Sequence, residues 1–136
     1  MFMRRATAAK LSIRDIIEGT PITGAEGRVV GVETHLGKVG RANVIATVVD
    51  LFEGTREDEE QEGGGFTTIT LDDGTGVIRV KIWGEMTQKL AHIKVGDLVL
   101  VIGKIRSFQD ETYLNGEVVR RLEDKNWETV RILELT

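Results

Sequence analysis

Apolar residues gather in five stretches of the chain, where they alternate with polar residues or follow one another directly. The stretches are residues 42–51, 66–71, 77–83, 98–108 and 112–122. Alternation with a period of two is typical of a strand with one buried face, and the β-branched stretch 42–51 is typical of a strand buried on both faces for part of its length. We therefore predict five β-strands at these positions.

The connections between these strands carry turn-forming residues. Residues 72–76 (DDGTG) separate the second and third strands, and Asp-Gly supplies the positive φ that a tight hairpin turn requires. Residues 109–111 connect the last two strands, and Gly103 is expected to kink the first of that pair. The pattern predicts two hairpins.

Three segments have helical rather than alternating patterns. They are residues 11–18, 85–93 and 124–135. Ser12 and Asp15 resemble a capping box at the start of the first, and Asp124 or Asn126 is expected to cap the last. Residues 1–10 are basic and without periodicity, which predicts a flexible arm, and the glycine-rich segment 20–40 is expected to be irregular with one possible strand at 29–32.

The order of three strands, a helix and two more strands is that of the OB-fold. We predict an all-β fold: a five-stranded OB-fold barrel with a short N-terminal helix, a helix between strands 3 and 4, and a C-terminal helix. A β-sandwich would need more strands than the chain holds. The predicted division is a flexible basic arm (1–10), an OB-fold domain (11–123) and a C-terminal helix (124–136).

Composition limits the class of protein further. The length of 136 residues suits one domain, and the absence of cysteine excludes disulfides and thiolate metal sites and is usual for a reducing compartment. No apolar run approaches the roughly 20 residues that span a bilayer, and residues 1–10 lack the apolar stretch of a secretory signal. We expect an intracellular protein with no membrane partner.

The net charge of −4 does not by itself favour nucleic acid as a partner. Six acidic residues and one arginine fall within residues 53–62, and the rest of the chain is close to neutral. The position of the cations therefore matters more than the total charge. We expect the acidic stretch to be a solvated loop.

The third predicted strand carries the most informative group of side chains. Alternation places Arg79, Lys81 and Trp83 on its outer face, opposite its apolar residues. Binding of single-stranded nucleic acid requires cations for the phosphates and flat aromatic rings for the bases. The alternative is that Trp83 folds under the following helix as part of the core.

The fourth predicted strand repeats this order of two cations and an aromatic ring in Lys104, Arg106 and Phe108. The alternative for Phe108 is that it closes the end of the barrel. Phe66 and Tyr113 lie on neighbouring strands and are further candidates, for which simple packing is equally open. Together these residues predict a binding surface on the outside of the barrel.

Residues 104–109 (KIRSFQ) and 110–114 (DETYL) resemble the fourth strand, loop and fifth strand of the middle subunit of replication protein A, and residues 72–76 resemble that family's second hairpin. The resemblance extends from about residue 11 to the C-terminus. It implies that aromatic rings at Trp83 and Phe108 stack on bases of single-stranded DNA. It also implies a role in DNA replication, repair and recombination, in the nucleoid or cytoplasm of an archaeon or the nucleus of a eukaryote.

The resemblance further implies that the C-terminal helix is an oligomerisation helix, which joins helices of the large and small subunits in a heterotrimer. Trp127, Val130 and Leu133 recur at helical spacing beside Ile132, in a stripe broader than one small barrel needs. The alternative is that this helix packs back across the open end of the barrel. The expected partners are single-stranded DNA and the two sister subunits.

Two other functions compete with this hypothesis. One is the small subunit, or the OB subunit of a telomere-capping complex, which would act mainly in protein assembly. The other is an enzyme, but His35 and His92 are isolated, and Asp72 and Asp73 are explained by turn chemistry. We expect no catalytic residue, no metal, no cofactor and no small-molecule substrate.

Overall fold

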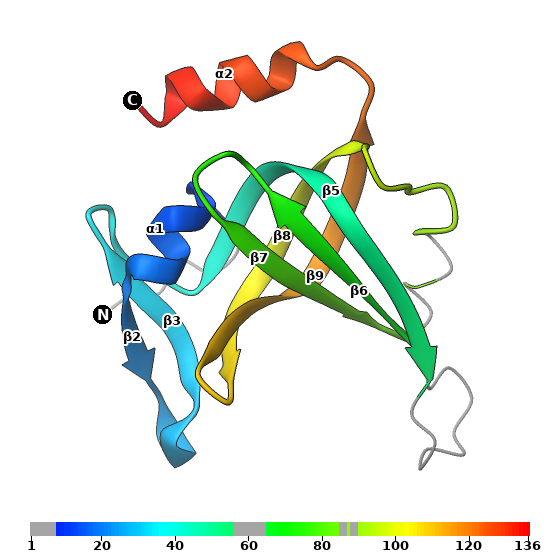
Figure 1. The fold of residues 1–136 in the computed structure, drawn as a ribbon. Helices are drawn as coiled ribbons and strands as arrows, with labels where there is room; N and C mark the ends of the chain where they lie inside the picture. Colours follow the sequence, from blue (N-terminus) through cyan, green and yellow to red (C-terminus); the bar gives the residue numbers. More distant parts are fainter. Residues whose placement is uncertain (1–7, 56–64, 85–86, 88–89) are drawn as a thin grey trace.

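The computed structural model describes residues 8–55, 65–84, 87 and 90–136 (Figure 1). Its main body is a barrel of five strands. They are β5 (Arg41–Thr55), β6 (Gly65–Asp72), β7 (Val77–Trp83), β8 (Leu98–Phe108) and β9 (Glu111–Leu122). Their order is β5-β6-β7-β9-β8, and β8 pairs back to β5 and so closes the barrel. The predicted five-stranded barrel is confirmed.

The interior of the barrel is filled by the apolar positions of the alternating pattern. Each of the following side chains has no exposed surface: Val44, Val48, Ile69, Leu71, Val80, Ile82, Val99, Val101, Ile105 and Leu114. Burying one such side chain stabilises the fold by about 1.5–3 kcal/mol. Because their neighbours in each strand point the other way, this core places the charged and aromatic residues of β6, β7 and β8 on the outside.

The hairpin between β6 and β7 forms as predicted. Gly74 has a φ of 88°, and the Asp72 carboxylate accepts a hydrogen bond of 2.8 Å from its N–H. The Asp73 carboxylate accepts from the backbone N–H of Thr75 at 2.8 Å and from that of Ile13 at 2.9 Å. Asp73 therefore joins the turn to the start of α1, and both aspartates are used in backbone capping.

The first helix, α1 (Ile13–Glu18), begins after Ser12, whose hydroxyl accepts a hydrogen bond of 3.1 Å from the backbone N–H of Asp15. The predicted cap is confirmed, and the helix starts two residues later than expected. Ile13 and Ile16 are buried. The helix thereby covers one end of the barrel beside β7 (Figure 1).

The glycine-rich segment that follows differs from the prediction. It forms a second, antiparallel sheet of three short strands: β2 (Thr20–Thr23), β3 (Val29–Thr34) and β4 (Gly37–Val39), with a 3₁₀ turn, η1 (Ala25–Gly27), after the first. The strand expected at 29–32 is part of β3, and the expectation of irregular structure was wrong for β2 and β4. Strands this short show no alternation. Gly31 permits the pairing, because a Cβ there would overlap the carbonyl of Val39.

The predicted flexible arm falls largely on residues 1–7, which lie outside the described residues. Its last part was predicted wrongly, because Ala9–Lys10 form β1, which pairs parallel with Ala42 and Asn43 of β5. An isolated two-residue strand has no periodicity that a sequence pattern could reveal.

The segment between β7 and β8 was predicted to be a helix over 85–93. Residues 85–86 and 88–89 lie outside the described residues. Leu90 and Ile93, at the end of this segment, are buried in the core.

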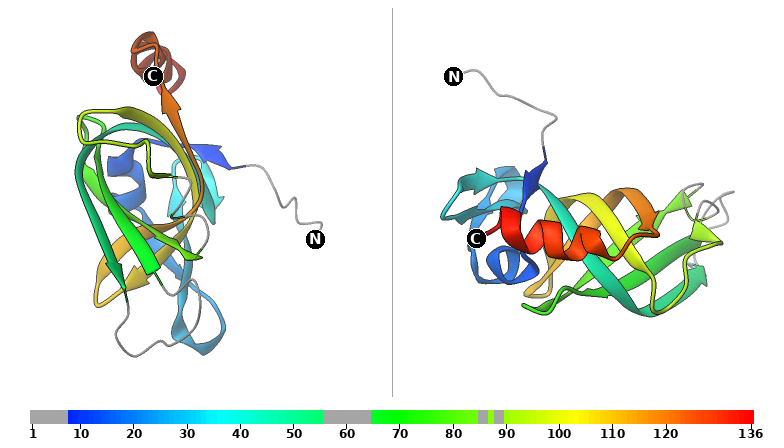
Figure 2. Two further views of the ribbon diagram at one scale, coloured as in Figure 1. Left: turned by 90° about the vertical axis from the view of Figure 1, so that its right-hand side faces the viewer. Right: turned by 90° about the horizontal axis from the view of Figure 1, so that it is seen from above.

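The C-terminal helix α2 (Asn126–Glu134) lies outside the barrel, alongside β5 (Figures 1 and 2). Its contact with the barrel is polar. Arg131 is 6% exposed and is the one buried residue of this fully described helix, and its guanidinium donates to the backbone carbonyl of Asn43 at 2.9 Å and to the side-chain carbonyl of Asn43 at 2.8 Å. Asp124 accepts from the N–H of Asn126, although the cap position itself is Lys125.

Two ion pairs of Glu134 reinforce the hydrogen bonds between Arg131 and Asn43, and we call these contacts together the Arg131 clamp. Glu134 accepts hydrogen bonds from Lys10 of β1 and from Arg131 of its own helix. The hydrogen bond from Lys10 and, more weakly, that from Arg131 hold the pKa of Glu134 below its ordinary value. The predicted apolar stripe of α2 is left exposed at Trp127, Val130, Ile132 and Leu133. The alternative that this stripe packs across the end of the barrel therefore does not hold.

In the part of the chain that the structure describes, no helix combines the length and the apolar character needed to cross a membrane.

Candidate functional site

The strand register brings the predicted site residues onto one outer surface of the barrel. Phe66 pairs with Trp83 and Thr68 with Lys81 across β6 and β7, and Tyr113 on β9 pairs with residues of both β7 and β8. All eight predicted residues lie on these four strands: Phe66, Arg79, Lys81, Trp83, Lys104, Arg106, Phe108 and Tyr113. We call this surface the outer face.

Both principal aromatic candidates are accessible. Trp83 is 38% exposed and Phe108 is 60% exposed. The alternatives that Trp83 belongs to the core, or that Phe108 closes the barrel, therefore do not hold. Phe108 lies at the end of β8, where the short turn to β9 contains Gln109 and Asp110, both with positive φ.

Lys81 links the aromatic residues at the centre of this face. Its Nζ lies 4.2 Å from the ring centroid of Tyr113 and 5.6 Å from that of Phe108. A lysine ammonium within about 6 Å of a ring centroid is attracted to the ring by a cation–π interaction. Lys81 thus places one positive charge between two rings, which is the combination that an unpaired nucleotide requires.

The remaining cations differ in how they are held. Arg79 forms an ion pair with Glu111, with 2.8 Å between Nη1 and Oε2, and both side chains are about half exposed. A hollow of about 430 Å³ beside this pair is lined in part by Ile17 and Thr70. Arg106 donates to the backbone carbonyl of its neighbour Ile105, whereas Lys104 is exposed.

One exposed aromatic residue of this region was missed. Phe52 is 56% exposed, and its ring centroid lies 6.1 Å from that of Phe66, which in turn lies 5.3 Å from that of Trp83. The sequence prediction ended the first strand at Leu51, whereas β5 continues to Thr55. A β-bulge between Val48 and Asp50 shifts the register and places this ring on the same side as Phe66, whereas the two-residue period of the buried Val44 and Val48 would have turned it inward.

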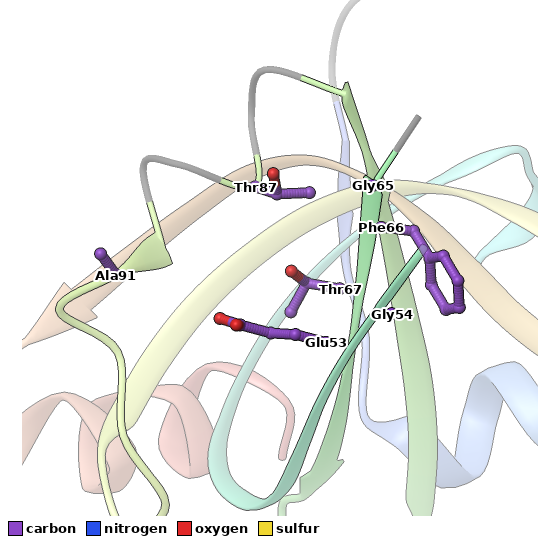
Figure 3. Close-up of a pocket in the computed structure, with 7 residues that line it drawn as sticks. All are labelled: Glu53, Gly54, Gly65, Phe66, Thr67, Thr87 and Ala91. Carbon is purple, nitrogen blue, oxygen red and sulfur yellow. The ribbon is translucent and has the colours of Figure 1, made fainter. Parts of the chain in front are cut away.

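The other side of β6 has a different character. Figure 3 shows the Phe66 ring turned to one side of its strand, while Thr67 and Glu53 point to the opposite side. A hollow of about 490 Å³ there is lined in part by Thr87 and Ala91. Among the residues that the structure describes, no group of three or more histidine or acidic side chains is placed to hold a metal ion. The exposed rings and cations of the outer face are thus the chemical feature that stands out.

Comparison with known proteins identifies relatives of this barrel. Residues 25–123 match the family model described as the OB-fold nucleic acid binding domain. The chain is 26% identical over 117 residues to replication factor A protein 2 of Schizosaccharomyces pombe, a match that covers 85% of this chain and 37% of that protein. This similarity confirms the resemblance to the replication protein A middle subunit. The chain spans less than half the length of the curated relatives it matches.

Two solved structures share the fold. One is a chain of a replication protein A heterotrimer bound to single-stranded DNA, with a TM-score of 0.71 and 21% identity over 96% of this chain and 93% of that one. The other comes from the Stn1–Ten1 complex of S. pombe, with a TM-score of 0.73 and 20% identity over 96% of this chain and 89% of that one. Both similarities concern the barrel and the flanking elements together.

Proposed function

The chain belongs to the OB-fold nucleic acid binding domain family, and we propose that it binds single-stranded DNA on the outer face, as the middle subunit of a replication protein A-like heterotrimer. The observation that carries this proposal is the grouping of Lys81 with Tyr113 and Phe108, beside the exposed ring of Trp83. Base stacking on aromatic rings combined with cations along the backbone is the usual means of sequence-tolerant single-strand binding.

The positions of the cations support binding of single-stranded DNA on the outer face. Arg79, Lys81 and Arg106 lie on the strands β7 and β8 that flank Tyr113. Phosphates can contact these cations while the bases lie on the rings. Aromatic rings and cations of this kind bind single-stranded DNA but do not catalyse a reaction on it. We therefore propose a binding role in replication, repair and recombination rather than catalysis. The protein would act where the cell keeps its DNA, the nucleus in a eukaryote.

A double substitution tests DNA binding. Trp83→Ala with Phe108→Ala removes two exposed rings without touching the core, and each ring that stacks one base contributes about 1–3 kcal/mol. The affinity for labelled oligo-dT, measured by fluorescence anisotropy, should therefore fall by at least about 30-fold while the circular dichroism spectrum is unchanged. If a folded double variant binds as tightly as the parent, the outer face is not the DNA site. That result would favour the alternative of an OB subunit acting mainly in protein assembly.

The exposed side of α2 supports the second half of the proposal. Trp127, Val130 and Leu133 are each more than a third exposed, and their spacing of three residues places them on one side of the helix. The Arg131 clamp holds the helix against the barrel by its polar contact, so this apolar side faces outward. We propose that it packs against one helix of the large subunit and one of the small subunit, whereas Ile132, about 100° around the helix from Leu133, lies outside this side.

Two charges placed on this side test the assembly. Val130→Asp with Leu133→Asp should prevent heterotrimer formation, because burying an unpaired carboxylate in a helical interface is costly. Light scattering after size-exclusion chromatography of co-expressed subunits gives the mass. Glu128→Gln on the same helix is the control. A heterotrimer that still forms with the double variant would mean that assembly uses another surface.

A further inference from the structure

Three aromatic rings lie in a row across neighbouring strands of the barrel. They are Phe52 on β5, Phe66 on β6 and Trp83 on β7. Adjacent centroids are 6.1 and 5.3 Å apart, with interplanar angles of 48° and 39°. We call these residues the aromatic row. Phe66 and Trp83 belong to the outer face defined above, whereas Phe52 was not among the predicted site residues.

A glycine opposite Phe66 makes this arrangement possible. Gly54 on β5 pairs with Phe66, and a Cβ at position 54 would lie 2.8 Å from Cζ of Phe66 and 3.0 Å from Cε2 of Phe52. Both rings therefore occupy the space that any other residue would fill. Glycine in a strand interior weakens the strand, so a glycine here serves the rings rather than the sheet.

The far end of the row is the most exposed. Phe52 contacts Phe66, but this contact leaves 56% of its side chain exposed. An exposed phenyl ring forgoes the stabilisation of about 1.5–3 kcal/mol that full burial would give. Because Phe52 is continuous with Trp83 through Phe66, a ligand that stacks on Trp83 can also reach Phe52.

We propose that Phe52 and Phe66 extend the stacking surface of Trp83 across β6 onto β5, so that a bound single strand of DNA passes at least one additional base over Phe52. This inference rests on the proposed function. Neither β6 nor residues 50–54 contain lysine or arginine. The contact at Phe52 is therefore to a base and not to a phosphate, in contrast to the contacts at Lys81.

That difference gives the inference a distinctive experimental signature. Removing a ring that stacks on a base lowers affinity without changing the dependence of affinity on salt, whereas removing a cation that pairs with a phosphate flattens it. An extension of the path also requires a strand long enough to reach it. The effect of removing Phe52 should consequently depend on the length of the oligonucleotide, and the effect of removing Trp83 should not.

The test compares the parent, Phe52→Ala and Trp83→Ala of the full chain, with oligo-dT of about 4 to 16 nucleotides, at several salt concentrations, by fluorescence anisotropy. Phe52→Ala should bind the longer oligonucleotides about 5- to 10-fold more weakly than the parent, at the lower end of what one stacked base contributes. It should bind the shortest ones equally well, with an unchanged salt slope throughout. Phe52→Tyr keeps the ring and should keep the affinity.

Two further variants guard against indirect effects. Val49→Ala truncates a 45% exposed apolar side chain of the same strand outside the row and should bind as the parent does. Gly54→Ala retains both phenylalanines but displaces their rings, so it should reproduce the weaker binding seen with Phe52→Ala.

The two possible failures are distinguishable. If the parent binds no oligo-dT, or if Trp83→Ala binds as tightly as the parent, the proposed function is wrong and this inference falls with it. If Trp83→Ala weakens binding but Phe52→Ala matches the parent at every length, the DNA site ends at Trp83 and only the extension onto β5 is refuted.

Discussion

Glu111 forms an ion pair with Arg79 that a DNA phosphate would have to replace. Removing the Glu111 carboxylate should therefore increase the affinity for single-stranded DNA. The 2.8 Å ion pair joins two side chains that are 53% and 46% exposed, and exposed pairs of this kind are worth about 0.2–1 kcal/mol. A phosphate that binds Arg79 must first displace the carboxylate, so the free energy of the ion pair is subtracted from the binding free energy. Glu111→Gln removes this cost and also removes a negative charge from the path of the DNA backbone.

The expected gain follows from these values. Recovery of about 0.2–1 kcal/mol corresponds to a 1.4- to 5-fold tighter complex, and the slope of log affinity against log salt should steepen by up to about 0.7 as Arg79 gains a phosphate. Fluorescence anisotropy with oligo-dT at several salt concentrations measures both quantities. Glu128→Gln makes the same change of net charge on α2 and is the matched control. Equal or weaker binding by Glu111→Gln would refute the proposal that Arg79 exchanges Glu111 for a phosphate.

Three further predictions concern charges. Replacing Arg79, Lys81 and Arg106 by glutamine should flatten the salt slope by about 0.7 for each phosphate that no longer pairs with a cation, and an unchanged slope in a titration series would make these cations ordinary surface charges. Arg131→Ala should lower the free energy of unfolding by about 1–3 kcal/mol in urea titrations, because it leaves the Asn43 carbonyls without this donor; no change would mean that α2 does not stabilise the barrel. The pKa of Glu134 is lowered in the folded protein, so its contribution to stability is present above the ordinary value of 4.5 and is lost as the pH falls through the lower folded pKa. The difference in urea midpoint between the parent and Glu134→Gln should accordingly disappear in acid, and a difference that persists there would contradict this.

The barrel could be predicted from the sequence because its determinants are local. Alternation over β7 places Trp83 outside and Ile82 inside without knowledge of any partner strand, and the turn at 72–76 is set by its own aspartates and Gly74. The outward cations and rings follow from the same alternation. Their selection as a site needed only the general chemistry of single-strand binding.

What escaped prediction depends on contacts between segments distant in sequence. Lys81 reaches Tyr113 because β7 and β9 pair in parallel, and no local pattern specifies that pairing. Phe52 was missed because the acidic residues after it suggested that the strand had ended, although pairing with β6 carries β5 on to Thr55. The burial of Arg131 was equally unforeseen, since it requires Asn43 from the first strand of the barrel.

The central claim, that bases stack on the outer face, is tested most directly by the fluorescence of Trp83. The chain has two tryptophans, so Trp127→Phe leaves Trp83 as its one indole. Titration of this variant with oligo-dT should quench the fluorescence to a saturating level, with the same midpoint as the anisotropy of the labelled strand, because a stacked base lies against the ring. Emission that stays unchanged while anisotropy reports full binding would contradict the account, because the DNA would then lie elsewhere on the protein.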